Sequence, residues 1–406
     1  MTRAVKQGTL EVRQADGPVS TFGQPASGFP DIAIRFADAR VTRDILTDFA
    51  LGAAEAFMDG RLLIERGDIM ALVQLLRLNA RWDKGGNKPR ASLGKRMTNR
   101  VAFAVEQVNR QVTARTNVAH HYDIGNALYQ LMLDPEHMQY SCAYWPGEDM
   151  TLANAQEAKL AHIAAKLALR PGDMVLDIGC GWGGMAIYLA RHYDVSVHGI
   201  TLSTEQLALA KQRAHDAGVA ERVIFELADY RDLPTREFRY DRIVSVGMFE
   251  HVGRAQFPAF FDACARLLAD DGVMLLHTIG RMGGPGTTDA FTRKYIFPGG
   301  YIPALSEIVS ASERVRLIAS DVETWRLHYA RTLRAWYANC LANRDAIVAI
   351  FDERFFRMWT FYLAGATAAF ESGSMCNYQI QYIRQRDAVP LTRDYIAAEE
   401  RRLRIA

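Results

Sequence analysis

The sequence lacks any Cys-x-x-Cys pair, and its cysteines are odd in number. The five of them are widely spaced, at Cys142, Cys180, Cys264, Cys340 and Cys376. This pattern argues against a disulfide framework and against a zinc site, and it favours a reducing compartment. We therefore expect neither disulfide bonds nor a bound metal ion.

Long apolar runs are missing as well. The N-terminal residues, MTRAVKQGTLEVRQ, do not contain the apolar core of a signal peptide. The longest apolar stretch, residues 359–370, is too short to span a bilayer. These absences predict a cytoplasmic protein, and any membrane contact is expected to be peripheral, on the inner face of the membrane.

The chain has little net charge, +2 over 406 residues, but its charges are unevenly placed. The segment from Arg77 to Arg115 holds ten Lys and Arg against two acidic residues, a local charge of +8 that leaves −6 elsewhere. Such a segment could lie on an anionic lipid surface or a nucleic acid, or it could be a solvated linker around Gly85–Pro89. The near-neutral total and the absence of an NPPY-like tetrad disfavour a nucleic-acid methyltransferase, so we expect no nucleic-acid partner.

The most informative segment that is present is MVLDIGCGWGG, residues 174–184. It predicts a strand, a tight loop and a helix start, where backbone N–H groups can approach a small cofactor. Gly179, Gly181 and Gly184 also satisfy the G-x-G-x-x-G spacing of dinucleotide sites, which alone is a weak signal. Asp177 places a carboxylate just before the loop. That charge is unfavourable beside a pyrophosphate but suits a cofactor with ammonium and sulfonium groups.

A dinucleotide site would also need an acid about 20 residues further on, and none is there. Residues 200–203 read ITLS instead. An acid follows the third predicted strand, at Asp229, where it could accept a hydrogen bond from an adenine amino group. S-adenosylmethionine (SAM) therefore fits this pattern better than NAD.

From Leu152 onward, helical and strand patterns alternate, which is typical of a parallel sheet with helices on both faces. A capping box at Ser203–Gln206 is expected to start the helix after the second strand. Asp270-Asp271-Gly272 is expected to turn into the fifth strand. The aromatic, helical residues 281–375 are expected to cover the substrate crevice. The five predicted strands are residues 174–178, 195–200, 223–227, 241–246 and 273–278.

The residues before the sheet predict a small α+β domain. Residues 9–13 and 31–36 have β-type patterns, and residues 45–79 have helical apolar spacing that is broken at Gly60. A linker at residues 82–93 and a helical segment at residues 101–112 follow. We expect an N-terminal lipid-associated domain with its basic linker over residues 1–115. The catalytic domain, with an α/β Rossmann-like class I methyltransferase fold, is expected over residues 116–406.

Polar residues follow several predicted strands, where open α/β sheets bind ligands. Glu250 and His251 follow the fourth strand, and His277 ends the fifth. His120–Asp123 and Tyr140–Cys142 lie in the segment that leads into the sheet. Taken singly, each of these residues is weak evidence for a functional site, because a histidine in a strand is more often a hydrogen-bonded core residue than a catalyst. Cys180, inside the glycine loop, is interpreted as a packing residue.

Taken together, these segments resemble the cyclopropane fatty acid synthases. Those SAM-dependent enzymes of lipid biosynthesis methylenate the double bond of an unsaturated acyl chain within a phospholipid. The resemblance covers about residues 115–390, and LGAAEAFMDGRL (residues 51–62) more loosely resembles the small lipid-associated domain of the bacterial enzymes. The mycolic-acid synthases generally lack that domain, so its presence favours a phospholipid. The motifs are HHYDIGNALYQLMLD (120–134), MQYSCAYW (138–145), VLDIGCGWGG (175–184), DRIVSVGMFEHVG (241–253), LLHTIG (275–280) and KYIFPGGYIP (294–303).

The resemblance implies two sets of site residues. Family enzymes hold a bicarbonate ion as the active-site base, and its ligands here would be Cys142, Glu250, His277, the Ile279 backbone and Tyr329. Thr201 and Gln206 would contact the SAM ribose in place of the usual acid. The whole set expected at SAM is Tyr140, Ser141, Asp177, Gly179, Gly181, Thr201, Gln206, Asp229 and Tyr230.

The resemblance further implies a homodimer that acts on unsaturated phospholipid acyl chains at an anionic membrane surface. Methyl transfer to an alkene leaves a carbocation, and loss of a proton from the new methyl group closes the ring. The alternative is a related SAM-dependent lipid C-methyltransferase that gives methyl- or methylene-branched chains, or one whose acceptor is an amine. A non-catalytic SAM-binding protein is disfavoured because Glu250, His277 and Tyr329 are all present.

Overall fold

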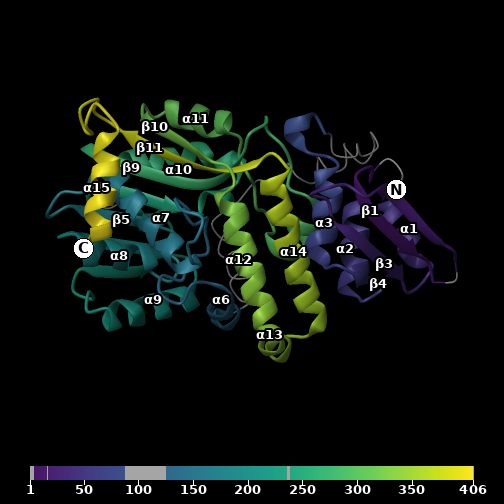
Figure 1. Cartoon of the computed structure of the whole chain (residues 1–406). Helices are drawn as coiled ribbons and strands as arrows, with labels where there is room; N and C mark the ends of the chain where they lie inside the picture. Colours follow the sequence, from purple (N-terminus) through teal and green to yellow (C-terminus); the bar gives the residue numbers. More distant parts are fainter. Residues whose placement is uncertain (1–3, 16, 87–124, 236–237, 406) are drawn as a thin grey trace. The chain divides into compact units, whose positions relative to one another are not determined.

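The computed structural model describes residues 4–15, 17–86, 125–235 and 238–405 (Figure 1). The chain divides into two compact units. The first contains Met1–Thr98, Asp289–Pro298 and Ala330–Met375, and the second contains Asn99–Thr288, Gly299–Tyr329 and Cys376–Ala406. Three predicted features lie outside the described residues: the domain boundary at 115, most of the basic segment with the helix at 101–112, and His120–Asp123.

The first unit is built on a four-stranded sheet with the order β2-β1-β3-β4. β1 pairs antiparallel with β2 and parallel with β3, which in turn pairs antiparallel with β4. Both predicted β-type runs are confirmed, since they match β1 and β3. The strands are β1 (Gly8–Arg13), β2 (Val19–Gln24), β3 (Asp31–Phe36) and β4 (Leu62–Arg66).

The predicted helical run of residues 45–79 is only partly right. Its helices are α1 (Arg40–Thr47), α2 (Phe49–Met58) and α3 (Ile69–Leu78), but strand β4 interrupts them. The helix ends before Gly60, which has a φ of 70°. The short apolar run after it then joins the edge of the sheet, where tertiary pairing overrides the helical spacing.

The same unit contains most of the aromatic helices that follow the catalytic motifs. α14 packs against α2 and α3. Gln74 of α3 donates from Nε2 to Glu371 Oε2 of α14 at 2.9 Å. The predicted cover over the substrate crevice stays a prediction. These later elements are α12 (His328–Ala342), α13 (Arg344–Ile350), α14 (Glu353–Glu371) and a short turn, η5 (Thr292–Ile296).

The second unit contains a seven-stranded sheet with the order β10-β11-β9-β8-β5-β6-β7. All five predicted strands are confirmed in position, and β5 and β7 match to the residue. Two further strands, β10 and β11, pair antiparallel with each other. The bounds are β5 (Met174–Ile178), β6 (Ser196–Thr201), β7 (Val223–Leu227), β8 (Tyr240–Val246), β9 (Leu268–Arg281), β10 (Ile318–Trp325) and β11 (Met375–Ile383).

The predicted turn at Asp270-Asp271-Gly272 is wrong. These residues lie inside β9, which begins at Leu268. The pairing of β8 with β9 shifts register there, from Tyr240↔Leu268 to Arg242↔Val273. The acidic residues and glycine are therefore accommodated as a bulge in a continuous strand rather than as a turn before it.

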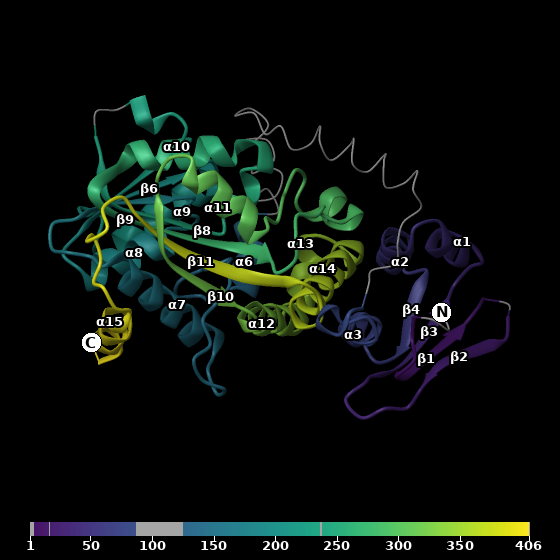
Figure 2. The ribbon, with the colours of Figure 1, turned by 90° about the horizontal axis from the view of Figure 1, so that it is seen from above.

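Helices cover both faces of this sheet, as predicted (Figure 2). One hydrophobic core joins α7, α8, α9 and α15 to the strands, and a second core joins α10 and α11 to them. Of the described residues, none form a helix long and apolar enough to cross a membrane. The helices are α6 (Asn126–Met132), α7 (Leu152–Leu167), α8 (Gly184–His192), α9 (Thr204–Asp216), α10 (Phe257–Leu267), α11 (Leu305–Glu313) and α15 (Asp394–Ile405), with short turns η1 (Trp82–Lys84) in the first unit and η2 (Leu233–Thr235), η3 (Phe249–His251) and η4 (Arg254–Gln256) here.

Candidate active site

The glycine loop between β5 and α8 has the tight geometry that its sequence predicts. Gly179, Gly181 and Gly183 have φ values of 82°, 55° and 78°, a region that favours glycine. The backbone N–H groups of Gly179 and Cys180 both donate to the Ile200 carbonyl oxygen at 2.9 Å. The loop is thus tied to the end of β6, and α8 begins directly behind it.

A cavity opens at the carboxyl ends of β5, β6, β7 and β8, beside this loop. It is the position at which open parallel sheets bind ligands. The structure brings together at this cavity all nine residues predicted for the cofactor. They are Tyr140, Ser141, Asp177, Gly179, Gly181, Thr201, Gln206, Asp229 and Tyr230.

Asp177 is the buried acid of the cavity. Its side chain is 1% exposed, and its Oδ2 has no hydrogen-bond partner within the described part of the chain. Burial raises the pKa of this carboxyl to about 7, and the Lys159 ammonium opposes that rise. A buried carboxylate oxygen that lacks a partner fits a cationic group of a ligand.

The polar side chains after β6 contact each other at the cavity. Thr201 donates from Oγ1 to Gln206 Oε1 at 2.9 Å, and Ser203 Oγ accepts from the Gln206 N–H at 3.2 Å. The predicted capping box is half right. Ser203 caps α9, but its own backbone N–H donates to Thr201 Oγ1 at 3.2 Å rather than to the Gln206 side chain. Thr201 and Gln206 both line the cavity, where their side chains could meet ligand hydroxyls.

Asp229 forms an ion pair that the sequence pattern did not indicate. Arg231 donates to both of its oxygens, from Nε to Oδ1 at 2.8 Å and from Nη2 to Oδ2 at 2.6 Å. The guanidinium also lies 5.6 Å from the centre of the Tyr230 ring. All three residues line the cavity. Oδ1 also accepts from the Arg231 backbone N–H at 3.0 Å, so Oδ2 is the oxygen with a lone pair for a further donor.

Glu250 lies in the turn η3, after β8. Its Oε1 accepts from the Ile279 backbone N–H at 2.5 Å, while its Oε2 is buried and has no partner among the described residues. Burial raises the pKa of this carboxyl to about 7, against the Ile279 hydrogen bond, which lowers it. The structure therefore joins two of the residues predicted at the active-site base.

His277 is buried on β9, and side-chain amides of β11 contact both of its ring nitrogens. Asn377 Nδ2 lies 3.0 Å from Nε2, and Gln379 Nε2 lies 3.1 Å from Nδ1. Burial, and then the nearby cations of Lys159 and Lys166, hold the pKa of His277 well below its usual range. His277 is therefore a neutral imidazole, and the amide that faces its lone-pair nitrogen donates to it.

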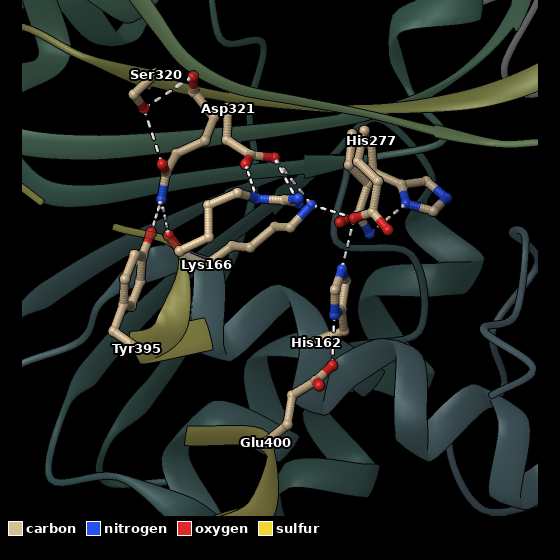
Figure 3. A network of polar contacts seen from close by, with 11 residues as sticks. His162, Lys166, His277, Ser320, Asp321, Tyr395 and Glu400 are labelled. Carbon is tan, nitrogen blue, oxygen red and sulfur yellow. Dashed lines mark hydrogen bonds and ion pairs between the residues drawn. The ribbon is translucent and has the colours of Figure 1, made fainter. Parts of the chain in front are cut away.

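A buried charge network lies next to His277 (Figure 3). His162 of α7 bridges two carboxylates, with Nε2 at 2.8 Å from Glu323 and Nδ1 at 2.5 Å from Glu400. Lys166 contacts the same Glu323 oxygen and lies 3.5 Å from Asp321. This network joins α7 and α15 to β10 behind the candidate active site.

The remaining predicted residues are buried as well. Cys142 is fully buried, and its Sγ donates to the Ala143 carbonyl at 3.4 Å. Tyr329, in the first turn of α12, is 6% exposed. The Trp325 ring meets the His277 ring edge to face at 5.2 Å. Its indole N–H is buried without a partner in the part of the chain that the structure describes.

Several polar residues at these sites were missed by sequence reasoning. Arg231 lines the cavity. Lys159 lies on α7, and Asn377 and Gln379 lie on β11, all three outside the quoted motifs. His251, which the sequence did single out after the fourth strand, also lines the cavity, and burial lowers its pKa to about 4.

Comparisons with known proteins agree with the motifs. The family described as mycolic acid cyclopropane synthetase matches residues 109–380. The chain is 39% identical to the cyclopropane-fatty-acyl-phospholipid synthase of Escherichia coli K12, over 92% of this chain and 93% of that protein. It is 44% identical to a probable fatty acid methyltransferase of Pseudomonas putida, over 65% and 68%. A solved structure of the mycolic acid cyclopropane synthase CmaA1, complexed with SAH and CTAB, is similar with 34% identity and a TM-score of 0.62. That likeness covers 66% of this chain and 97% of the other.

Proposed function

The chain belongs to the mycolic acid cyclopropane synthetase family, and from this premise we propose that it converts the cis double bond of an unsaturated fatty acyl chain into a cyclopropane ring. SAM donates the methylene group. The observation that carries this function is the single cavity that gathers all nine expected cofactor residues. The test is incubation with methyl-labelled SAM and vesicles of unsaturated phospholipid, followed by mass spectrometry of the lipids. Labelled cyclopropane lipid is expected, and unlabelled lipid would contradict the function.

We propose a phospholipid as the carrier of the acyl chain. The relative named cyclopropane-fatty-acyl-phospholipid synthase matches 92% of this chain, whereas the mycolic acid synthase structure covers only 66%. The phospholipid synthase therefore matches a larger part of this chain than the mycolic acid synthase does. This difference in coverage supports a phospholipid substrate presented in a membrane.

The residues at the cavity suit the expected chemistry. SAM supplies an electrophilic methyl group when it is bound, and an isolated alkene is a poor nucleophile, so the site must align the two and exclude water. Asp177 would hold the ammonium of SAM, Thr201 and Gln206 its ribose, and Asp229 its adenine. Once the methyl group is transferred, a base must remove one of its protons so that the ring can close.

We further propose that a bicarbonate ion lies at Glu250 and provides that base. The fit rests on the buried Glu250 Oε2, which lacks a partner among the described residues and would accept from the bicarbonate hydroxyl. Cys142, His277, Ile279 and Tyr329 would complete the ligand set. In the structure the Ile279 N–H bonds to Glu250, and side-chain amides contact both nitrogens of His277, so these two would share their contacts with the ion.

Asp229→Ala is expected to weaken SAM binding. The loss of a hydrogen bond to a charged acceptor is worth about 1.5–3 kcal/mol, or about 10- to 150-fold in Kd. The substitution also removes the carboxylate that neutralises the Arg231 guanidinium, which leaves a net positive charge beside a cationic ligand. Isothermal titration calorimetry with SAM measures the effect, and Arg231→Gln separates the two contributions. An unchanged Kd would remove Asp229 from the cofactor site.

We propose that the protein acts as a homodimer. We also propose that the basic segment, Arg77–Arg115, attaches the protein peripherally to anionic membranes. Each well-placed cation contributes about 1 kcal/mol, and salt screens the attraction. Charge reversal at Lys95 and Arg96 is expected to reduce co-sedimentation with anionic vesicles, as is added salt. Reversal at Arg344 and Arg354 of unit 1 is the matched control. If co-sedimentation with anionic vesicles changes neither on charge reversal at Lys95 and Arg96 nor on added salt, the segment is only a linker.

A related C-methyltransferase remains the second candidate, favoured by the 44% identity to a probable fatty acid methyltransferase. The same cation would then lose a different proton and give a methylene-branched chain. Its conversion to a saturated methyl branch would need a separate hydride donor, such as a reduced nicotinamide. Mass spectrometry of the labelled lipid after oxidative cleavage distinguishes a ring from a branch. A branched product alone would replace ring closure as the reaction.

A further inference from the structure

Lys159 is a fully buried lysine that the proposed chemistry leaves without a role. It lies on α7 with no exposed surface. Its Nζ donates to Gln139 Oε1 at 2.5 Å and to Ser141 Oγ at 2.9 Å. Both acceptors line the cofactor cavity, so the ammonium stands directly behind the cavity wall.

Helix α7 holds this wall at a second point. Gln156, one turn before Lys159 and equally buried, donates from Nε2 to the carbonyl oxygens of Gln139 and Ser141 at 3.2 and 3.0 Å. The wall segment between these carbonyls contains Tyr140, another expected cofactor residue. One face of α7 therefore sets both the backbone and the side chains of this wall.

Lys159 also acts on the charge of the cavity. Burial lowers its own pKa to about 7, and its attraction to Asp177 opposes the raised pKa of that carboxyl. Within the described part of the chain, the titratable groups that interact with Asp177 are Lys159 and Cys180. Burial and the Asp177 charge together raise the pKa of Cys180. The titratable groups that interact with Lys159 are Asp134, His137, Cys142, Asp177 and His277.

We propose that Lys159 is a positioning residue for SAM, which braces Gln139 and Ser141 in the cavity wall and keeps Asp177 in the carboxylate form that the SAM ammonium needs. This proposal rests on the proposed function, in which Asp177 meets that ammonium. A lysine with only a packing role would contribute to stability but would not set the pH at which SAM binds.

The test is the Kd for SAM of Lys159→Met, measured by calorimetry over a pH series that spans the pKa of Asp177. Wild-type affinity is expected to fall as pH falls through about 7, because Asp177 becomes protonated. Without the Lys159 cation the pKa of Asp177 rises, so the fall begins at higher pH. At neutral pH the variant should bind about tenfold more weakly, the effect of one pKa unit.

Two variants serve as matched controls. Lys166→Met removes the other fully buried lysine of α7, whose Nζ contacts Glu323 and Asp321 rather than the cavity (Figure 3). It is expected to cost stability but to leave the pH midpoint in place. Lys159→Arg keeps a cation and is expected to keep the wild-type midpoint.

The α-amino group of SAM itself titrates at about 7.7–8.0. This contribution is the same for every variant, so it cancels when their pH midpoints are compared.

A wild-type midpoint in Lys159→Met, or an equal shift in Lys166→Met, would overturn the proposal. If Lys159→Met does not fold, proton release on SAM binding is compared between wild type and Asp177→Asn, in buffers of different ionisation enthalpy. The comparison is made at about pH 7, where the Asp177 carboxyl is partly protonated before SAM binds. Equal release by the two proteins at that pH would overturn the proposal as well. A wild-type protein that binds no SAM would overturn the proposed function too, whereas tight binding with an unmoved midpoint overturns only the role of Lys159.

Discussion

Glu250→Gln is expected to lower turnover by about 10²- to 10⁴-fold, the usual contribution of general-base catalysis. The fold and the affinity for SAM should be preserved. Glutamine has the same shape, and its carbonyl oxygen can still accept from the Ile279 N–H. What it loses is the second carboxylate oxygen, which is buried and lacks a partner among the described residues.

The pH profile gives a second readout of the same carboxyl. Burial raises the pKa of Glu250 to about 7, so the carboxylate that accepts a hydrogen bond is lost as pH falls through that value. Wild-type turnover should therefore decline on the acidic side of neutrality. Because glutamine does not titrate, this part of the decline should be absent from the Glu250→Gln profile.

The measurement is mass spectrometry of lipids after incubation with labelled SAM. The loss should be largest at ring closure, so the residual product is expected to include methyl-branched or rearranged chains. Glu399→Gln is the matched control, since Glu399 lies on α15, outside the cavity lining, and accepts from the Tyr193 hydroxyl at 2.6 Å. Wild-type turnover of Glu250→Gln, with cyclopropane as its only product, would show that Glu250 is structural.

The strands of the catalytic sheet could be predicted because each is a short apolar run bounded by turn residues. β5 and β7 match their predictions to the residue. β4 could not be predicted, because its apolar run continues a helical spacing and only pairing with β3 makes it a strand. β11 begins after the helices of the other unit, so its place beside β10 depends on contacts about 60 residues apart in sequence.

Part of the expected cofactor set could be placed at the cavity for a related reason. Asp177, Asp229 and the loop glycines follow the ends of neighbouring strands or form the glycine loop, and parallel topology brings those ends to one edge. Tyr140 and Ser141 precede α7, and the family resemblance implied them. Lys159 and Gln379 could not be found this way. A lysine in a helical pattern is usually a solvated residue, and the polar Gln379 lies in a strand that was not predicted. Their burial is a property of the packed structure, and local pattern carries no sign of it.

Gly184→Ala is expected to damage the cofactor cavity through a single added methyl group. A Cβ on Gly184 would lie less than 3.0 Å from the His137 carbonyl oxygen and from Gln139 Nε2, closer than real Cβ atoms come. Asp134 holds this segment in place, since its carboxylate accepts from the backbone N–H groups of His137 and Gln139 at 2.6 and 3.1 Å. Overpacking of this kind costs about 1–3 kcal/mol.

That cost should lower the Tm. The part of it that SAM binding must reverse should raise the Kd for SAM, by up to about 150-fold, because the crowded segment continues into the cavity wall. Alanine also has the higher helix propensity, worth about 1 kcal/mol at an interior position, but Gly184 is the first residue of α8 and gains less. Gly365→Ala isolates that gain. Gly365 lies inside α14 with no atom within 4 Å of its added Cβ, so this variant should have a higher Tm and an unchanged Kd. A Gly184→Ala variant with the same Tm change and the same Kd for SAM as Gly365→Ala would contradict this prediction. The cavity wall would then move aside without a free-energy cost, and the contacts of Asp134 and Lys159 with Gln139 would not hold it rigidly.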